Sequence, residues 1–157
     1  MNNFIPADIY GKIQKIMPVA CIDLIIETES GVLLGIRDHE PMKGKRWFIG
    51  GRMLYGETLE QAAKRKAKEE TGLDVKVVRQ VGAYTLQFTK GEKRYNVAVV
   101  YLVRKTKGQL NLNKEYSGHV FLKSPDRKLH PYVLTALNDS KIFKKAIKIP
   151  KRNHFLN

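Results

Sequence analysis

The chain has 157 residues, 43% of them hydrophobic, and a formal net charge of +14 at pH 7. This length suits one compact domain over residues 1–157 and is too short for two ordinary domains. The single cysteine, Cys21, excludes a disulfide framework. No apolar run approaches the roughly 20 residues of a membrane span, and the first residues lack the apolar centre of a signal peptide, so we expect a cytoplasmic protein.

The first predicted elements are a helix and two strands. Apolar residues at helical spacing predict a short helix over residues 6–16. The apolar run 19–26 predicts a buried strand, and the turn residues 29–31 lead back into a second strand over residues 32–37. The polar loop 38–46 that follows contains His39 and could reach a substrate.

The next predicted element is a capped helix. Thr58 stands three residues before Gln61, which predicts a capping box for a helix from about Leu59 to Thr71. Gly72 ends this helix. Its predicted buried stripe consists of Leu59, Ala62, Ala63 and Ala67.

The remaining segments predict four strands and a last helix. Strands on both sides of one long helix, without repeating βαβ units, predict a mixed sheet covered by helices in an α/β/α sandwich. The predicted segments are strands over 75–78, 81–88, 94–103 and 119–122, a hairpin turn at 89–92, and a helix over 131–137.

A sequence motif overlaps the capped helix. Its residues have the spacing G-x5-E-x7-R-x3-EE-x-G, which arises by chance roughly once in ten million trials. Positions 66, 69 and 70 project together over one edge of the helix, so two carboxylates could bind a divalent cation there. The turn before the helix could add a backbone carbonyl as a ligand. The motif residues are Gly51, Glu57, Arg65, Glu69, Glu70 and Gly72, followed by the apolar Leu73.

The motif resembles the box of the Nudix hydrolases, G-x5-E-x7-R-E-U-x-E-E-x-G-U, where U is aliphatic. The resemblance extends over residues 17–122 and implies the Nudix-like sandwich and a hydrolase that uses Mg²⁺, or alternatively Mn²⁺, held by Glu69 and Glu70. The backbone carbonyl of Gly51 is the further ligand that the turn could add. Lys66 stands where many members have a glutamate that binds metal or acts as a base. A solvated helix in which Lys66 pairs with Glu70 is the alternative reading.

A second set of residues is similar to the GDP-mannose mannosyl hydrolase branch of that family. The branch has counterparts of Asp23, Arg37 and Arg52, and it also lacks the glutamate at the position of Lys66. The resemblance implies that both arginines bind the diphosphate and stabilise the departing GDP, because the guanidinium fork suits phosphate oxygens. It also implies that Asp23 contacts the sugar or a second subunit, that water attacks the anomeric carbon, and that the protein is a homodimer.

The catalytic base of this branch has no counterpart in the chain. Its Gln-His pair falls on Glu115 and Tyr116, and a tyrosine with a pKa near 10 is a poor base at neutral pH. Glu115 and His119 are therefore the candidate bases, and in a regular strand they would share a face and a cleft. His119 as a loop residue without a role is the alternative. We expect Arg65 to position Glu57 or a ligand carboxylate rather than to contact substrate.

Three functions remain open. The first is glycosyl hydrolysis of a GDP-sugar to GDP and a hexose. The second is pyrophosphohydrolysis of ADP-ribose, a nucleotide sugar or a nucleoside triphosphate, and the third is noncatalytic binding of a nucleotide or RNA. We interpret the basic segment 141–157 as a solvated helix end and tail, and an RNA or membrane contact is the alternative. No RNA-binding signature accompanies it, so no specific nucleic acid or membrane partner is predicted.

Overall fold

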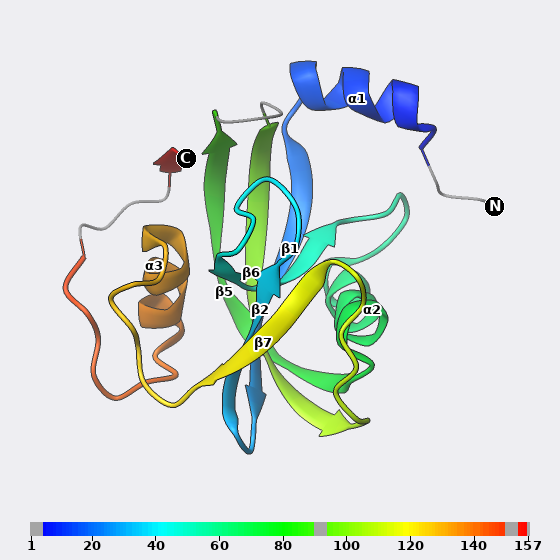
Figure 1. Cartoon of the computed structure of the whole chain (residues 1–157). Coiled ribbons are helices and arrows are strands. Elements are labelled where there is room, and N and C mark those ends of the chain that lie inside the picture. Colours follow the sequence, from blue (N-terminus) through cyan, green and yellow to red (C-terminus); the bar gives the residue numbers. More distant parts are fainter. Residues whose placement is uncertain (1–4, 90–93, 150–153, 157) are drawn as a thin grey trace.

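The computed structural model describes residues 5–89, 94–149 and 154–156. Within these ranges the chain forms three helices and eight strands (Figure 1). The helices are α1 (Ala7–Ile16), α2 (Leu59–Thr71) and α3 (Pro131–Ser140). The strands are β1 (Val19–Thr28), β2 (Gly31–Arg37), β3 (Arg46–Trp47), β4 (Ile49–Arg52), β5 (Asp74–Phe88), β6 (Arg94–Lys107), β7 (Tyr116–Leu122) and β8 (His154–Leu156).

The strands form one mixed sheet. Its order is β3-β2-β1-β6-β5-β8, with β4 paired to β1 and β7 paired to β2. The pairs β1–β6 and β5–β8 are parallel, and the other pairs are antiparallel. Helices α2 and α3 flank the sheet on opposite sides (Figure 1). The predicted α/β/α sandwich with a mixed sheet is confirmed.

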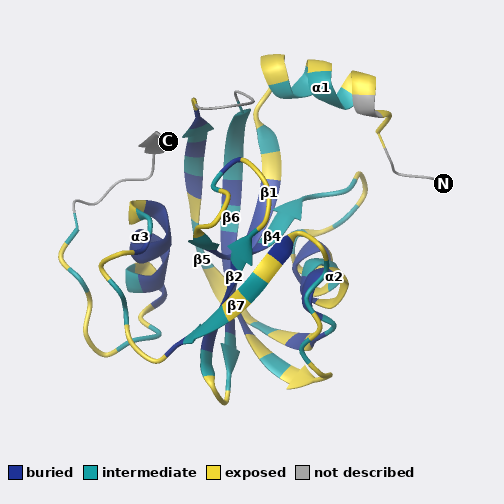
Figure 2. Cartoon of the chain, viewed as in Figure 1, coloured by how far each residue is buried: buried dark blue, intermediate teal, exposed yellow. Residues whose placement is uncertain are grey.

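Strand β1 divides the core into two halves. Ile22, Leu24 and Ile26 pack with the buried alanines of α2, whereas Ile25 packs with the buried residues of α3. This division follows from the alternation of side chains across a strand. Asp23 points to the α3 side, where Tyr132 binds it. Figure 2 shows the buried residues gathered in the central strands and on the inner faces of α2 and α3.

Several predicted boundaries need correction. The two strands predicted over 75–78 and 81–88 are one continuous strand, β5, because bulges in its pairing with β6 absorb the predicted break. Strand β6 continues past residue 103 to Lys107, and β7 begins at Tyr116, three residues earlier than expected. Most of the predicted hairpin turn at 89–92 lies outside the described residues.

The helix end expected from residue 141 onward is not formed in the described residues, although Lys141, Lys144, Lys145 and Lys148 are exposed as expected. Helix α3 ends at Ser140, and the chain then runs back along it without a further helix in the described part. The Asn138 amide group donates to the carbonyl of Ile147 at 2.7 Å and accepts from its N–H at 3.2 Å. Ile142, Phe143, Ile147 and Ile149 pack against the α3 side of the core. Apolar residues among the lysines therefore fix this segment.

Helix α1 forms at the predicted position but leaves apolar side chains exposed. Ile9 is 46% exposed, Ile16 78% and Met17 56%. In Figure 1 the helix lies at one end of the sheet, beyond the sandwich layers. None of the helices described here is long and apolar enough to cross a membrane.

Candidate active site

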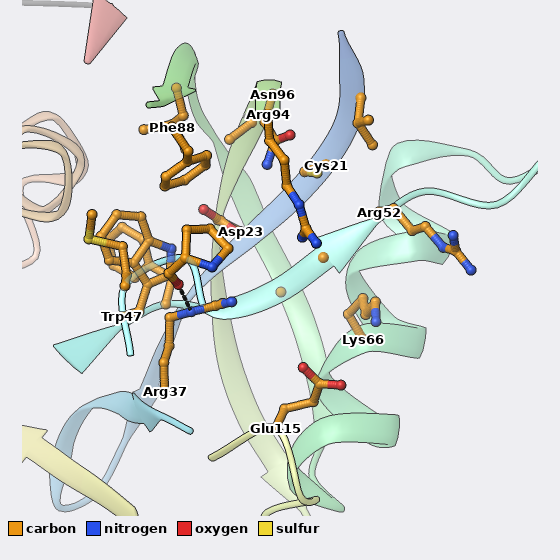
Figure 3. A pocket seen from close by; sticks show the side chains of 18 of the residues that line it. Cys21, Asp23, Arg37, Trp47, Arg52, Lys66, Phe88, Arg94, Asn96 and Glu115 are labelled. Carbon is orange, nitrogen blue, oxygen red and sulfur yellow. Dashed lines mark hydrogen bonds between the residues drawn. The ribbon is translucent and has the colours of Figure 1, made fainter. Parts of the chain in front are cut away.

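A pocket of about 540 Å³ opens beside β1, β4 and β6 and is lined also by α1, α2 and the 37–42 loop. Figure 3 shows Arg37, Arg94, Lys66 and Glu115 directed toward a common space, whereas Arg52 points away from it. The charged residues that line the pocket are Asp23, Arg37, Arg52, Lys66, Glu70, Arg94 and Glu115. Its apolar end contains Met42, Trp47, Phe48, Leu86 and Phe88.

Helix α2 begins and ends as its sequence predicts. The Thr58 hydroxyl accepts from the Gln61 N–H at 3.2 Å, and the Gln61 side chain accepts from the Thr58 N–H at 2.8 Å. Gly72 adopts the left-handed conformation with φ of 70° that ends the helix. These local contacts fix which side chains of α2 face the pocket.

Arg65 joins the helix to the loop before it. Its guanidinium donates to both carboxylate oxygens of Glu57, to Glu69 at 2.9 Å and to the Arg52 carbonyl at 3.2 Å. The hydrogen bonds from Arg65 lower the pKa of Glu57, which also accepts from the Leu54 N–H at 2.8 Å. These contacts agree with a structural role in which Arg65 and Glu57 hold the helix and the preceding loop together.

Glu70 is buried at the floor of the pocket, with only 3% of the residue exposed. Its Oε1 lies 2.9 Å from the Lys66 ammonium nitrogen. Its Oε2 accepts from the Tyr116 hydroxyl at 2.6 Å and from the Gly50 N–H at 3.2 Å. Both oxygens of the carboxylate are therefore bound within the protein.

The three predicted metal ligands do not converge. Glu69 binds Arg65, its side chain is 49% exposed, and it is not among the pocket residues. Beside Gly51, the Lys66 ammonium occupies the contact to Glu70 that a cation would need. In the described part of the chain, no three His, Cys, Asp or Glu residues gather to hold a metal ion. As arranged here, this donor set does not fit a divalent cation.

Asp23 is the second buried carboxylate of the pocket. The Tyr132 hydroxyl donates to its Oδ2 at 2.6 Å. Burial raises the pKa of Asp23 to about 6, although the Tyr132 hydrogen bond and the charge of Arg37 act in the opposite direction. A Cβ atom at Gly50 would lie 2.6 Å from Asp23 Oδ1 and 2.1 Å from the Ile22 carbonyl oxygen, so glycine permits β4 to pack here.

Arg37 and Glu115 meet at His39. Arg37 donates through Nε to the Pro41 carbonyl at 2.7 Å, and its Nη2 lies 3.3 Å from His39 Nε2. Glu115 Oε2 lies 2.8 Å from the same His39 nitrogen. That nitrogen either donates to Glu115 or accepts from Arg37, since it cannot do both. The rim of the pocket thus has two alternative hydrogen-bond arrangements.

Arg52 lines the pocket but turns its guanidinium toward α1. The centre of the group lies 4.3 Å from the centroid of the Tyr10 ring, a distance typical of a cation–π contact. This contact places the helix residue Tyr10 in the pocket wall, a role that the sequence did not indicate.

The expected cleft shared by Glu115 and His119 is absent from the structure. Strand β7 begins after Glu115, and its pairing with β2 shifts register between Ile36 and Arg37, so the regular alternation does not extend to Glu115. Glu115 lines the pocket. His119 is exposed, does not line it, and packs against Phe121 with ring centroids 5.2 Å apart.

Tyr116 lies between Glu115 and His119 in the sequence, and its role in the structure was not expected. It is buried, and burial together with the nearby Glu70 raises its pKa well above the ordinary value. It therefore acts as a hydrogen-bond donor to Glu70 at neutral pH. The ring fits because position 35 is glycine, where a Cβ atom would lie 2.2 Å from the Tyr116 ring.

Two pocket residues on β6 were not predicted from the sequence. Arg94 and Asn96 alternate with outward residues, and Asn96 pairs with Val19 in the parallel β1–β6 ladder. Strand alternation could have predicted that both side chains lie on the same face of the strand, but not that this face lies beside β1. Cys21 also lines the pocket, and burial raises its pKa to about 12, so its thiol stays protonated.

Comparison with known proteins identifies the family. The family model described as the NUDIX domain matches residues 17–131. The low-salt glycan biosynthesis protein Agl8 of Haloferax volcanii is 34% identical over 135 residues, which cover 82% of this chain and 86% of that protein. An ADP-ribose pyrophosphatase of Methanocaldococcus jannaschii is 34% identical over 93 residues, covering 59% of this chain and 54% of that protein.

A solved structure has the same fold. The NUDIX hydrolase from Nitrosomonas europaea superposes with a TM-score of 0.62 at 19% identity, covering 89% of this chain and 80% of that one. Members of the family generally use divalent metal ions, whereas in this chain the Lys66 ammonium group contacts Glu70. The family-model match, the relatives and the fold together show that the chain belongs to the Nudix hydrolase family.

Proposed function

We propose that the protein hydrolyses a nucleoside diphosphate sugar, with a GDP-mannose-like substrate as the first candidate. The observation that carries this proposal is the division of one pocket into a cationic part and an aromatic part. A diphosphate needs positive charge, whereas a nucleobase or a sugar ring packs well on aromatic side chains. The similarity to a glycan biosynthesis protein supports a sugar-linked substrate.

The cationic side chains have distinct parts in this proposal. Arg37 and Arg94 face the open space and bind the diphosphate oxygens, and Arg52 joins them by leaving the Tyr10 ring. Positive charge at this place also stabilises the negative charge that develops on the leaving nucleotide. Trp47 and Phe88 line the apolar end, which takes the nucleobase.

The acidic side chains act on the sugar and on water. Asp23, inside the pocket wall, hydrogen-bonds to the sugar, and Glu115 at the rim accepts a proton from the attacking water. His39 adjoins Glu115 at 2.8 Å and orients its carboxylate. In this proposal His119 has no catalytic part.

A specific observation favours a second candidate, pyrophosphohydrolysis of ADP-ribose or a nucleoside triphosphate. Glu115 lines the pocket on the side of Arg37, where it could direct water at a phosphorus atom. The similarity to an ADP-ribose pyrophosphatase, of which the chain spans 54%, points in the same direction.

The two candidates differ in the bond that breaks. The test is hydrolysis of GDP-mannose, GDP-glucose, ADP-ribose and nucleoside triphosphates in ¹⁸O-labelled water, with and without Mg²⁺, and mass analysis of the products. We expect the label in the free hexose beside unlabelled GDP. Label in a phosphate would instead assign the chain to pyrophosphohydrolysis. Binding without turnover of any compound would support the noncatalytic nucleotide-binding alternative.

We further propose that residues 1–157 act as one cytoplasmic domain and that two copies associate through α1. The exposed Ile9, Ile16 and Met17 support this, since a second copy would remove these apolar side chains from water. Replacing Ile9 and Ile16 by Ser should convert the dimer into a monomer in light scattering coupled to gel filtration. A wild-type protein that is monomeric at all concentrations would overturn the assembly.

A further inference from the structure

We propose that Lys66 is a built-in cation of this pocket. Its ammonium group lies beside Glu70 and Gly51 in the place of a divalent metal ion and binds the substrate diphosphate directly. The first part of this inference stands on the geometry of the chain alone, and the contact with a diphosphate rests on the proposed function.

The position of the ammonium group is fixed by its surroundings. Lys66 Nζ lies 2.9 Å from Glu70 Oε1, and the two side chains are only 17% and 4% exposed. A Cβ atom placed on Gly51 would lie 3.0 Å from Lys66 Cε and 3.1 Å from Nζ. Glycine at position 51 therefore leaves the space that the ammonium group fills. Lys66 and Glu70 are i and i+4 on α2, so the helix itself brings them together.

The charges around the site are already close to balance. Arg65 neutralises Glu57 and partly Glu69, while Lys66 pairs with Glu70 and lies 3.8 Å from Glu69. These five side chains carry three negative and two positive charges, which leaves one negative charge. A glutamate in place of Lys66 would leave three. The attraction of this cluster for a divalent ion is thus much lower with lysine present.

Coordination chemistry adds to this effect. A Mg²⁺ ion binds oxygen at roughly 2.0–2.1 Å and requires octahedral geometry. An ion that close to Glu70 Oε1 would lie within a few ångströms of the Lys66 ammonium and be repelled by it. The second oxygen of Glu70 is occupied by Tyr116 and Gly50. The ion could enter only if Lys66 left.

The same ammonium group has hydrogen atoms left for a ligand. An ammonium group has three N–H donors, and the bond to Glu70 uses one. The group lines the pocket together with Arg37 and Arg94. A diphosphate between these cations would be neutralised by the side chains of the protein, in the way that a metal ion would neutralise it.

The first experiment measures metal binding without any substrate. Mn²⁺ binding to the metal-stripped protein is followed by electron paramagnetic resonance for the wild type, Lys66→Glu, Lys66→Arg and the control Lys64→Glu. Lys64 is exposed on the same helix, so the control makes the same charge change away from the pocket. We expect Lys66→Glu to bind Mn²⁺ at least about tenfold more tightly than the other three. Equal Mn²⁺ affinity in the wild type and Lys66→Glu would overturn the built-in cation.

The second experiment measures nucleotide binding without metal. Titration calorimetry with ADP and GDP in excess EDTA compares the wild type with Lys66→Met, and circular dichroism checks that each variant is folded. We expect the wild type to bind one nucleotide and Lys66→Met to lose at least about tenfold in affinity, with Lys66→Arg recovering most of it. Unchanged affinity in folded Lys66→Met would overturn the diphosphate contact. If neither nucleotide binds the wild type with or without Mg²⁺, the proposed substrate class is wrong, and the Mn²⁺ series still decides the role of Lys66.

Discussion

The pocket contains two buried carboxylates, Asp23 and Glu70, in similar but unequal surroundings. Each accepts a hydrogen bond of 2.6 Å from a buried tyrosine hydroxyl, Tyr132 for Asp23 and Tyr116 for Glu70. Glu70 also has an ion pair with Lys66 at 2.9 Å and a backbone donor. The described structure gives Asp23 no ion pair, and its pKa rises to about 6.

The difference shows how far one tyrosine hydroxyl can stabilise a buried carboxylate. One neutral donor offsets only part of the cost of removing a carboxylate from water. Glu70 has a contacting cation in addition, whereas Asp23 has only the more distant charge of Arg37, and the pKa of Asp23 remains raised. The pocket therefore combines a carboxylate in an ion pair with one that can exchange a proton near pH 6.

The largest expected effect tests Asp23. A carboxyl pKa raised in the folded state gives stability that is fully present below pH 4 and is lost as the pH rises through about 6. The shift from 3.8 to about 6 corresponds to about 3 kcal/mol. Asp23→Asn keeps an acceptor for Tyr132 and carries no charge. Its free energy of unfolding should exceed that of the wild type at pH 7.5 and lose this advantage by pH 4. Chemical denaturation at both values measures this, and a pH-independent difference would contradict it.

A smaller effect separates the two tyrosines. Tyr132→Phe removes a donor from a carboxylate without an ion pair and should cost about 2 kcal/mol at pH 8. Tyr116→Phe should cost only about 1 kcal/mol, because Lys66 and Gly50 still bind Glu70. The cost of Tyr132→Phe should shrink at pH 5, where Asp23 is mostly protonated. Thermal unfolding of both variants at the two pH values makes the comparison, and equal costs would mean that Lys66 does not compensate Glu70.

The sequence predicted the motif helix far better than the rim of the pocket. Helix α2 has the predicted bounds because its cap, its end and its alanine stripe depend on residues within a few positions of each other. The same local spacing explains why the Lys66–Glu70 pair was foreseeable as an alternative. Strand alternation and helix spacing were also sufficient for the sandwich.

The rim depends on contacts between distant segments. His119 was misplaced because a register shift in the pairing of β2 and β7 cannot be read from the residues of β7 alone. Arg94 was missed because β6 reaches the site through parallel pairing with β1, in which the paired residues Val19 and Asn96 are 77 positions apart in the sequence. Glu69 has the expected helical spacing, yet Arg65 draws it away from the pocket.

The close approach of Gly35 to Tyr116 constrains how this pocket can change by mutation. A methyl group at position 35 would lie 2.2 Å from the ring, so any larger residue there must displace the hydroxyl that binds Glu70. Replacing Tyr116 first with a smaller residue removes that obstacle. Substitutions at the two positions are therefore epistatic and have a preferred order, with position 116 changing before position 35. A chain with histidine at position 116 is therefore one substitution away, whereas a branched residue at position 35 requires two.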